Sequence, residues 1–213
     1  GAGSAKKSRV VLDAMSAYGT GNLYVPVDVS AEFLHDTAQR LRVEYHGLRV
    51  EPEVADITEP LEISVTLPRP SWLALLGSTI GIFDADGAVR LLCRVARQLR
   101  PDDRFLMGAD LRPGGLKTVR RLEMAYNDEA GVTAEFNLNV LRVLNGELGT
   151  DFDLAAFRHR AFYNVEHGRI EMHLDAQGEQ AVAFPDGGGS IHFADGESVR
   201  TEISCKYDRA TID

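Results

Sequence analysis

The feature that most constrains the fold is an alternation of apolar, strand-like segments with amphipathic helical segments over residues 1–113. The segments "LYVPVDV", "GLRVEPEVADI", "SWLALLGS" and "RFLMGADL" read as buried strands, and stretches with helical spacing lie between them. Strands that alternate with helices favour a parallel sheet covered by helices on both faces. The sequence therefore predicts an α/β domain for residues 1–113.

Three helices are expected in this domain, each with its own signal. The first follows the opening glycines, and its apolar positions at helical spacing are Val10, Val11, Ala14, Met15 and Tyr18. Ser30 is the expected N-cap of the second helix, which reaches Tyr45. The third helix has an expected apolar face of Val89, Leu92, Cys93, Ala96 and Leu99.

The alternation stops at "LRPGG", and a different pattern follows. Helical stretches are predicted at about residues 115–128 and 131–149. The apolar period then becomes two, so "RIEMHL" and "QAVAF" are expected to form a hairpin around "DAQGE". "FPDGGGSIHF" is expected to be a loop, and "SVRTEISC" a final strand. The second region therefore reads as α+β with antiparallel pairing.

Composition excludes several classes of function. The net charge is −9, which disfavours a basic nucleic-acid-binding face and favours a small-molecule role. The two cysteines, Cys93 and Cys205, have no metal-like spacing, and a reducing cytoplasm is expected. The six histidines form no ligand cluster, so no metal site is predicted. No apolar run approaches the roughly 20 residues that a membrane-spanning helix needs.

The opening "GAGSAKK" is a glycine loop that runs into a helix. Such loops let the backbone approach a ligand, and the helix that follows offers free N–H groups. Asp28, at a strand end, is placed for ribose hydroxyls, and Asp56, at the next strand end, for an adenine amine. Lys6 replaces the third glycine of a dinucleotide fingerprint, and a P-loop is absent. S-adenosylmethionine tolerates a looser loop, and a plain tight turn is the alternative.

The last strand presents a carboxylate and a hydroxyl side by side. Residues i and i+2 of a strand point to one face, so Glu202 and Ser204 are neighbours and Arg200 joins them. The residues expected on the opposite face are Val199, Thr201, Ile203 and Cys205. Glu202 and Ser204 can accept from and donate to two ring nitrogens, although a solvated sheet face is the alternative.

Six stretches together resemble one family. They are "GAGSAKKSRVVLDA", "YVPVDVS", "GSTIGIF", "MAYNDEAGVTAEFNLNVL", "FRHRAFYNVEHGRIEMHL" and "RTEISCKY". They are similar to the S-adenosylmethionine-dependent histidine Nα-methyltransferases of ergothioneine biosynthesis. The resemblance implies a Rossmann-like class I methyltransferase sheet with an inserted α+β substrate-binding domain. Residues 1–113 would bind the donor, residues 114–206 would bind the substrate, and residues 207–213 would begin the return to the first sheet.

The resemblance also implies site residues. Those expected at the methyl donor are Gly1, Gly3, Lys7, Asp28, Asp56 and Ile57. Those expected at the substrate are Gly77, Ile82, Tyr126, Met172, Glu202 and Ser204. Within the second set, Tyr126 would bond the carboxylate of histidine, Glu202 and Ser204 would grip the imidazole, and Met172 would line its pocket.

Ile82 departs from the family pattern. The family normally has Asn at this place in "GSTIGIF", where it bonds the backbone end of the substrate. Isoleucine can neither donate nor accept, and one charge-assisted bond is worth roughly 1.5–3 kcal/mol, or about 10- to 150-fold in affinity. Another group could replace this bond, binding could be weak, or the substrate could be another amino acid or amine.

The family likeness also sets expectations for the chain as a whole. Family members carry an N-terminal segment and a first strand before the glycine loop, and further chain after "CKY", so an interior fragment is expected. The family's tyrosine beside the reacting amine lies in that N-terminal segment, so no catalytic residue is assigned. We expect a cytoplasmic monomer that trimethylates L-histidine to hercynine without metal, nucleic acid or membrane. A non-catalytic fragment that binds donor or substrate is the alternative.

Overall fold

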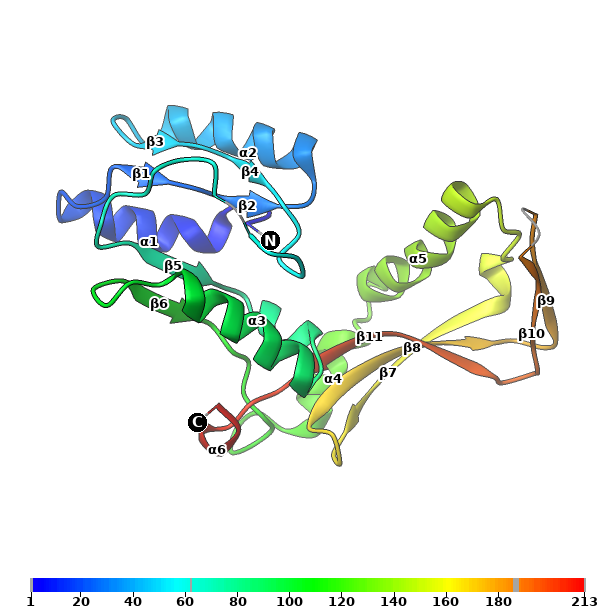
Figure 1. The fold of residues 1–213 in the computed structure, drawn as a ribbon. Coiled ribbons are helices and arrows are strands. Elements are labelled where there is room, and N and C mark those ends of the chain that lie inside the picture. The colour runs from blue at the N-terminus through cyan, green and yellow to red at the C-terminus, as the bar shows by residue number, and fades with distance from the viewer. Residues whose placement is uncertain (1, 62, 186–187, 213) are drawn as a thin grey trace. The chain divides into compact units, whose positions relative to one another are not determined.

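The fold is known from a computed structural model that describes residues 2–61, 63–185 and 188–212 (Figure 1). The chain divides into two compact units. Unit 1 comprises Gly1–Ile80 and Ala85–Ala109, and unit 2 comprises Gly81–Asp84 and Asp110–Asp213. Gly1, an expected donor-binding residue, lies outside the described residues. No helix in the described ranges combines the length and apolar character that crossing a bilayer requires.

Unit 1 contains parallel strand pairs, as its alternating pattern predicts. β1 (Leu23–Tyr24) and β2 (Val27–Asp28) pair with β3 (Arg49–Val50) and β4 (Glu53–Val54), respectively. β5 (Trp72–Leu75) pairs with β6 (Arg104–Met107). Proline has no N–H to donate, and Pro26 and Pro52 lie at the two interruptions. Unit 1 is therefore mixed α/β with short two-stranded sheets in its described residues.

The helices of unit 1 lie where the sequence places them. They are α1 (Lys6–Ala17), α2 (Ala31–Glu44) and α3 (Ala85–Gln98). A 3₁₀ turn, η1 (Thr79–Ile82), begins in unit 1 and ends in the Gly81–Asp84 segment of unit 2. Ser30 is the N-cap of α2, but its side chain makes no capping bond. Instead, Asp28 Oδ1 accepts from the backbone N–H of Ser30 at 3.2 Å. Apolar residues of α1, α2 and β3 form one buried cluster: Ala5, Leu12, Ala38, Leu41 and Val50.

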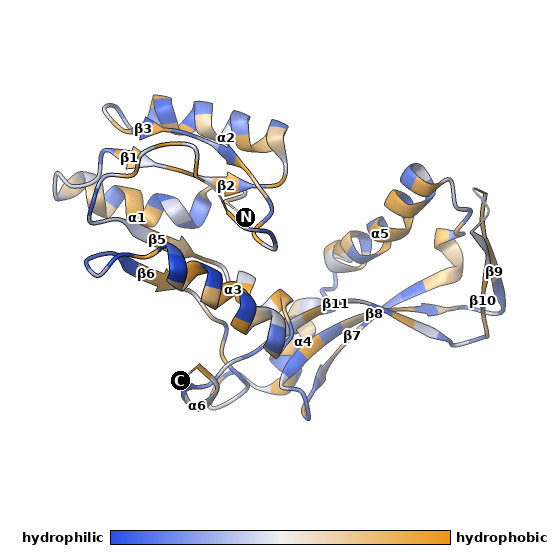
Figure 2. Cartoon of the chain, viewed as in Figure 1, coloured by the Kyte–Doolittle hydropathy of each residue, from blue (hydrophilic) through white to orange (hydrophobic). Residues whose placement is uncertain are grey.

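The expected apolar faces of α1 and α3 are wrong in part. Val10 of α1 is 72% exposed, and Tyr18, the C-cap residue after this helix, is 84% exposed. Leu12 is the buried residue of α1. In α3, Val89 is 59% exposed, whereas Ala88 and Leu91 are buried. Hydrophilic and apolar segments alternate along α3 (Figure 2), and polar residues of this helix bind the loop after β4. Gln98 Nε2 donates to the Leu61 carbonyl at 3.0 Å.

Unit 2 is built on an antiparallel sheet with the order β11–β8–β7. These strands are β7 (Phe157–Asn164), β8 (Arg169–Ala176) and β11 (Ser198–Cys205). Helices α4 (Val119–Tyr126) and α5 (Val132–Leu148) pack on this sheet, and short turns η2 (Leu154–Ala156) and α6 (Arg209–Ile212) complete the unit. Ile170 and Leu174 of β8 are fully buried beneath the helices. Truncation of such a side chain to alanine costs about 2–5 kcal/mol.

The predicted hairpin of "RIEMHL" with "QAVAF" is wrong. β8 pairs with β7 and β11, whereas β9 (Gln180–Phe184) pairs with β10 (Gly189–Phe193). β10 lies in the segment expected to be a loop. The ring of Phe193 in β10 lies 5.4 Å from the ring of Phe157, so this strand extends the aromatic core. Packing of this kind is not visible as a local period.

The predicted face of Arg200 is also wrong, because β11 contains a β-bulge. Arg200 lies opposite His173, but Glu202 lies opposite Met172, and the register shifts between them. Neighbouring residues of β8 point to opposite faces, so Arg200 and Glu202 do too. Val199 and Thr201, expected on the other face from Glu202, contact the helix-covered side instead.

Candidate functional site

The glycine loop of unit 1 is fixed to the end of β2 by Asp28. The backbone N–H of Gly3 donates to Asp28 Oδ2 at 2.9 Å. Burial opposes ionisation of Asp28, but hydrogen bonds from the Gly3 and Ser30 backbones outweigh it and lower the pKa of this carboxyl. Each carboxylate oxygen has further lone pairs, so Asp28 can also accept ribose hydroxyls. A Cβ at Gly3 would meet no atom within 4 Å, and this open space suits a ligand that contacts the backbone.

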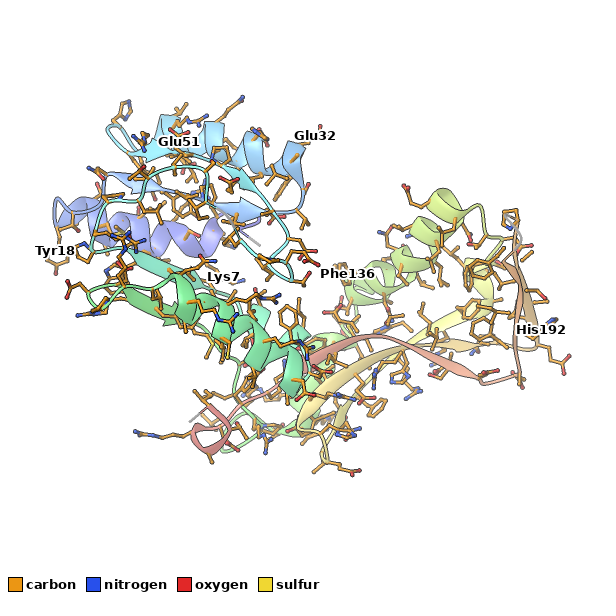
Figure 3. All side chains as sticks on the ribbon, in the orientation of Figure 1. Lys7, Tyr18, Glu32, Glu51, Phe136 and His192 are labelled. Carbon is orange, nitrogen blue, oxygen red and sulfur yellow. The ribbon has the colours of Figure 1, made fainter. Side chains whose placement is uncertain are left out.

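Lys7 and Gly77 lie together in unit 1. Gly77 has a φ of +78°, and a Cβ there would lie 2.6 Å from Lys7 Nζ. The side chain of Lys7 leaves the first turn of α1 (Figure 3). The backbone N–H of Ser78 donates to the Gly108 carbonyl at 2.9 Å, which ties the turn after β5 to the end of β6. A residue expected at the donor thus touches one expected at the substrate.

Asp56 and Ile57 form a turn just after β4. Asp56 is exposed and its Oδ1 accepts from the Thr58 backbone N–H at 2.7 Å. That hydrogen bond, with the side chain of Thr58, lowers the pKa of the Asp56 carboxyl. The ionised group faces solvent and can accept from an exocyclic amine, and the half-buried Ile57 beside it offers an apolar contact.

In unit 2, three polar side chains meet at the junction of α4 and β11. The hydroxyl of Tyr126, at the end of α4, donates to Ser204 Oγ at 2.9 Å. Lys206 Nζ donates to both oxygens, at 2.9 Å to the Tyr126 hydroxyl and at 2.7 Å to Ser204 Oγ. The Lys206 ammonium also lies 5.0 Å from the centre of the Tyr126 ring. Two expected substrate residues, Tyr126 and Ser204, are thus in direct contact.

Lys206 and Asp110 are site residues that the sequence analysis missed. Lys206 is 2% exposed, and its Nζ lies 3.1 Å from Asp110 Oδ2. Burial would raise the pKa of Asp110, but hydrogen bonds from Lys117 and Lys206 outweigh it and lower that pKa. The i, i+2 spacing that pairs Glu202 with Ser204 also reaches Lys206, so this lysine could have been found. Nothing local in the sequence marks Asp110.

Glu202 lies half-buried on β11, and Met172 of β8 is its register partner. Burial raises the pKa of the Glu202 carboxyl, and the charge of Lys206 offsets part of this rise. Glu202 makes no hydrogen bond to another residue of the described ranges, so its oxygens are available to a ligand. Met172 is 3% exposed and packs with Leu122 and Ile170, which makes it a wall beside this carboxylate.

Ile82 belongs to unit 2, together with the Tyr126–Ser204 pair. Its side chain is 49% exposed. The next residue, Phe83, is tied to the last strand, because the thiol of Cys205 donates to the Phe83 carbonyl at 3.3 Å. The apolar side chain of Ile82 therefore lies in a segment that is anchored to β11 next to Ser204.

The described residues hold no group of three or more His, Cys, Asp or Glu side chains that could bind a metal ion. The expected site residues fall into two sets. Gly3, Lys7, Asp28, Asp56, Ile57 and Gly77 lie in unit 1, and Ile82, Tyr126, Met172, Glu202 and Ser204 lie in unit 2.

A protein family and several individual proteins match this chain. The family of histidine-specific, SAM-dependent methyltransferases matches residues 1–213. A histidine N-alpha-methyltransferase of Mycobacterium tuberculosis is 40% identical over 209 residues, which is 97% of this chain and 63% of the relative. One of Mycolicibacterium smegmatis is 39% identical over 207 residues, again 97% and 63%.

A more distant relative matches a smaller share. Ergothioneine biosynthesis protein 1 of Neurospora crassa is 29% identical over 181 residues, 76% of this chain and 20% of that protein. The chain spans 63% of the length of the two bacterial relatives. From the match to its full length, the chain belongs to the family of histidine-specific, SAM-dependent methyltransferases.

Proposed function

We propose that the protein transfers methyl groups from S-adenosylmethionine to the α-amine of L-histidine, three in succession, and so forms hercynine for ergothioneine biosynthesis. One feature of the geometry supports this proposal most directly. Glu202 and Ser204 stand side by side on β11, and Tyr126 and Lys206 bond Ser204 directly. A carboxylate that accepts and a hydroxyl that donates match the two nitrogens of an imidazole.

Unit 1 is proposed as the donor-binding domain, with a Rossmann-like arrangement of its strands. Gly3 would admit the donor to the backbone, and Asp28 would accept the ribose hydroxyls. Asp56 and Ile57 would contact the adenine, and Lys7 would lie beside the loop, with Gly1 at its start. The open space at Gly3 and the ionised state of Asp28 support this assignment.

Unit 2 is proposed as the substrate-binding domain. Glu202 and Ser204 would hold the imidazole, with Met172 as an apolar wall. Tyr126 would bond the carboxylate of histidine by turning its one O–H proton from Ser204 Oγ to the ligand. The Lys206 ammonium strengthens this donor because it bonds the phenolic oxygen. Ile82 would lie at the amino-acid end of the substrate. Gly77, which belongs to unit 1, is also proposed as a substrate-binding residue.

The chemistry is an in-line displacement at carbon. Bound S-adenosylmethionine supplies an electrophilic methyl carbon on a sulfonium. The neutral α-amine of histidine forms the new N–C bond as the C–S bond breaks, and S-adenosylhomocysteine is the leaving group. The first and second transfers are each followed by loss of one proton from the amine. The third transfer gives a quaternary ammonium, which has no N–H proton to lose. Positioning of the two reactants contributes several kcal/mol, and the residues of this chain would serve that positioning. We assign no residue of the chain to the proton transfer, and we expect no metal.

The proposal also covers the location, the oligomeric state and the partners of the enzyme. We propose a cytoplasmic enzyme that acts as a monomer on a small molecule, without a nucleic-acid or membrane partner. The acidic net charge of −9 supports the absence of a nucleic-acid partner.

The test is incubation of the purified protein with S-adenosylmethionine and histidine, followed by mass spectrometry. The expected products are mono-, di- and trimethylated histidine, and Glu202→Ala should abolish most of the signal. Calorimetry with S-adenosylhomocysteine and histidine runs in parallel. Binding of both ligands without any methylated product would contradict the enzymatic proposal and favour a non-catalytic binder.

Ile82 favours a second candidate, methylation of another amino acid or amine. The apolar side chain of Ile82 cannot make the bond that the family's Asn makes to the amino-acid end of the substrate. Competition of histidine against phenylalanine, tyrosine and tryptophan distinguishes the two. Preference for histidine supports the first proposal, and preference for another amino acid supports the second.

A further inference from the structure

The bulge in β11 decides which face of the sheet carries Glu202 and Ser204. Thr201 is the extra residue, since it has no register partner in β8. If the same strand paired without a bulge, Arg200 would still lie opposite His173, but Thr201 would lie opposite Met172 and Glu202 opposite Glu171. A slip of one residue moves every following side chain to the other face.

The two faces differ sharply in what they offer Glu202. Glu171, on the face away from the helices, is a buried carboxylate whose Oε1 lies 2.7 Å from Arg169 Nη2. In a regular ladder Glu202 would stand directly opposite this like charge, which is unfavourable. With the bulge, Glu202 stands opposite Met172 and Ser204 reaches Tyr126. The candidate substrate site therefore exists because of one extra residue.

A single buried amide holds the bulge. Asn137, on α5, is 3% exposed, and its Oδ1 accepts from the Thr201 hydroxyl at 2.5 Å. Its Nδ2 donates to the His173 carbonyl of β8 at 3.0 Å. A carbonyl can only accept, so this contact settles which way the amide is turned. Asn137 thus bonds both strands at the point where their ladder is interrupted, and Thr201 Oγ1 also lies 3.1 Å from the Met172 carbonyl.

The same amide reaches Tyr126 through one histidine. Asn137 Nδ2 lies 2.9 Å from His159 Nδ1, and His159 Nε2 lies 2.8 Å from the Tyr126 carbonyl. Because the carbonyl accepts, Nε2 carries the proton and Nδ1 accepts from Asn137. Asn137 therefore fixes the backbone at Tyr126 as well as the bulge before Glu202.

We infer that Asn137 and Thr201 are positioning residues that set substrate specificity, because their hydrogen bond holds the bulge that turns Glu202 and Ser204 toward Tyr126. This inference rests on the proposed function, in which Glu202 and Ser204 hold the imidazole ring. Neither Asn137 nor Thr201 needs to touch the substrate. They affect substrate binding only by fixing the face of the sheet to which Glu202 points.

The test uses Thr201→Val, which keeps the branched shape and removes the hydroxyl. We expect KM for histidine to rise about 10-fold or more, with KM for S-adenosylmethionine changed less than about 2-fold. Thr201→Ser keeps the hydroxyl and should restore the wild-type KM. Thr150→Val is the matched control: Thr150 Oγ1 donates to Asn145 Oδ1 at 2.8 Å, the same chemical pair elsewhere in unit 2. It should leave both KM values unchanged.

A double-mutant cycle separates aiming of Glu202 from a general structural effect. Because Glu202→Ala removes most of the turnover, the cycle compares dissociation constants for histidine measured by calorimetry. In a Glu202→Ala background, Thr201→Val should change this constant by less than about 2-fold, because the group that Thr201 positions is gone. Equal effects in both backgrounds, or a wild-type KM in Thr201→Val, would overturn the inference. Thr201→Ala repeats the comparison should the valine variant unfold. If the wild-type protein neither binds nor methylates histidine, the proposed function itself is contradicted. This result differs from those that overturn only the inference about Asn137 and Thr201.

Discussion

Unit 1 and unit 2 build their candidate sites from different materials. In unit 1 the polar contacts run between carboxylates and backbone: Asp28 with Gly3, and Asp56 with Thr58. In unit 2 they run between side chains, from Lys206 to Ser204 and Tyr126. A site made of backbone is sensitive to glycine geometry, whereas a site made of side chains is sensitive to the loss of a single polar group. Substitutions in the two units should therefore fail in different ways.

The largest expected effect is that of Lys206→Met. This change removes a buried cation that bonds Tyr126, Ser204 and Asp110. Each hydrogen bond to a charged group is worth about 1.5–3 kcal/mol. Affinity for histidine should fall by about 30-fold or more, with affinity for S-adenosylhomocysteine unchanged, as measured by calorimetry. Lys117→Met is the control, because Lys117 also bonds Asp110 but touches neither hydroxyl. An equal loss of histidine affinity in Lys206→Met and Lys117→Met would contradict a role for the bonds of Lys206 to Tyr126 and Ser204, because the two variants share only the contact with Asp110.

Lys206→Met should also shift the pH dependence. The charge of Lys206 lowers the pKa of Glu202, which burial raises, so its removal raises that pKa further. The ionised carboxylate is then lost at a higher pH as the solution is acidified. The acidic limb of the kcat/KM profile for histidine should move to higher pH in the variant. A limb that stays in place would contradict the role of Glu202 as the ionised acceptor.

A gain of function is expected next, from Ile82→Asn. The new amide would supply the bond that the backbone end of histidine lacks, worth about 10- to 150-fold in affinity. Ile82→Val is the control and should leave the affinity near that of the wild type. Weaker binding of histidine by Ile82→Asn, with tighter binding of another amino acid, would point to a different substrate.

In unit 1, Gly77→Ala should cost about 1–2 kcal/mol, because L-residues resist positive φ. The expected fall in melting temperature is about 2–8 °C. A Cβ at Gly77 would also meet Lys7, whereas Gly3, with a φ of +51°, has open space around it. Gly3→Ala is therefore the matched control, with the conformational cost alone. A Gly77→Ala variant more stable than Gly3→Ala would contradict the packing of Lys7 on this turn.

The smallest effect concerns acid stability, through Asp128 before α5. Hydrogen bonds from Thr133, and from the Val132 backbone, lower the pKa of Asp128 to about 2, against about 3.9 in an unfolded chain. A depressed pKa stabilises the fold above about pH 4, and this stabilisation is lost as the pH falls toward 2. Asp128→Asn should thus lower the urea midpoint at pH 6 but not near pH 2. A difference in urea midpoint between Asp128→Asn and the wild type that stays constant from pH 6 to pH 2 would contradict the predicted pH dependence.

The sequence predicted the individual helices and strands better than it predicted which strands pair. Helices α1, α2, α4 and α5 and strand β11 follow from period and capping residues, and their bounds lie close to those expected. Strand pairing was less predictable: β9 alternates like a partner for β8, yet it pairs with β10. Pairing depends on contacts between distant segments, such as the Phe157–Phe193 pair, which no local pattern encodes.

The candidate site shows the same limit. A spacing of two residues correctly placed Glu202 and Ser204 on one face, but it could not reveal the bulge that moves Arg200 to the other. That bulge depends on Asn137, which lies 64 residues from Thr201 in the sequence. Lys206 could be read from its spacing to Ser204, whereas its partner Asp110 became visible only in the structure.

The most direct test of the central claim is a crystal structure with S-adenosylhomocysteine and histidine bound. The account predicts that the ribose hydroxyls bond Asp28, and that the two imidazole nitrogens bond the Glu202 carboxylate and the Ser204 hydroxyl. An imidazole ring bound elsewhere, with Glu202 and Ser204 left to solvent, would contradict the account.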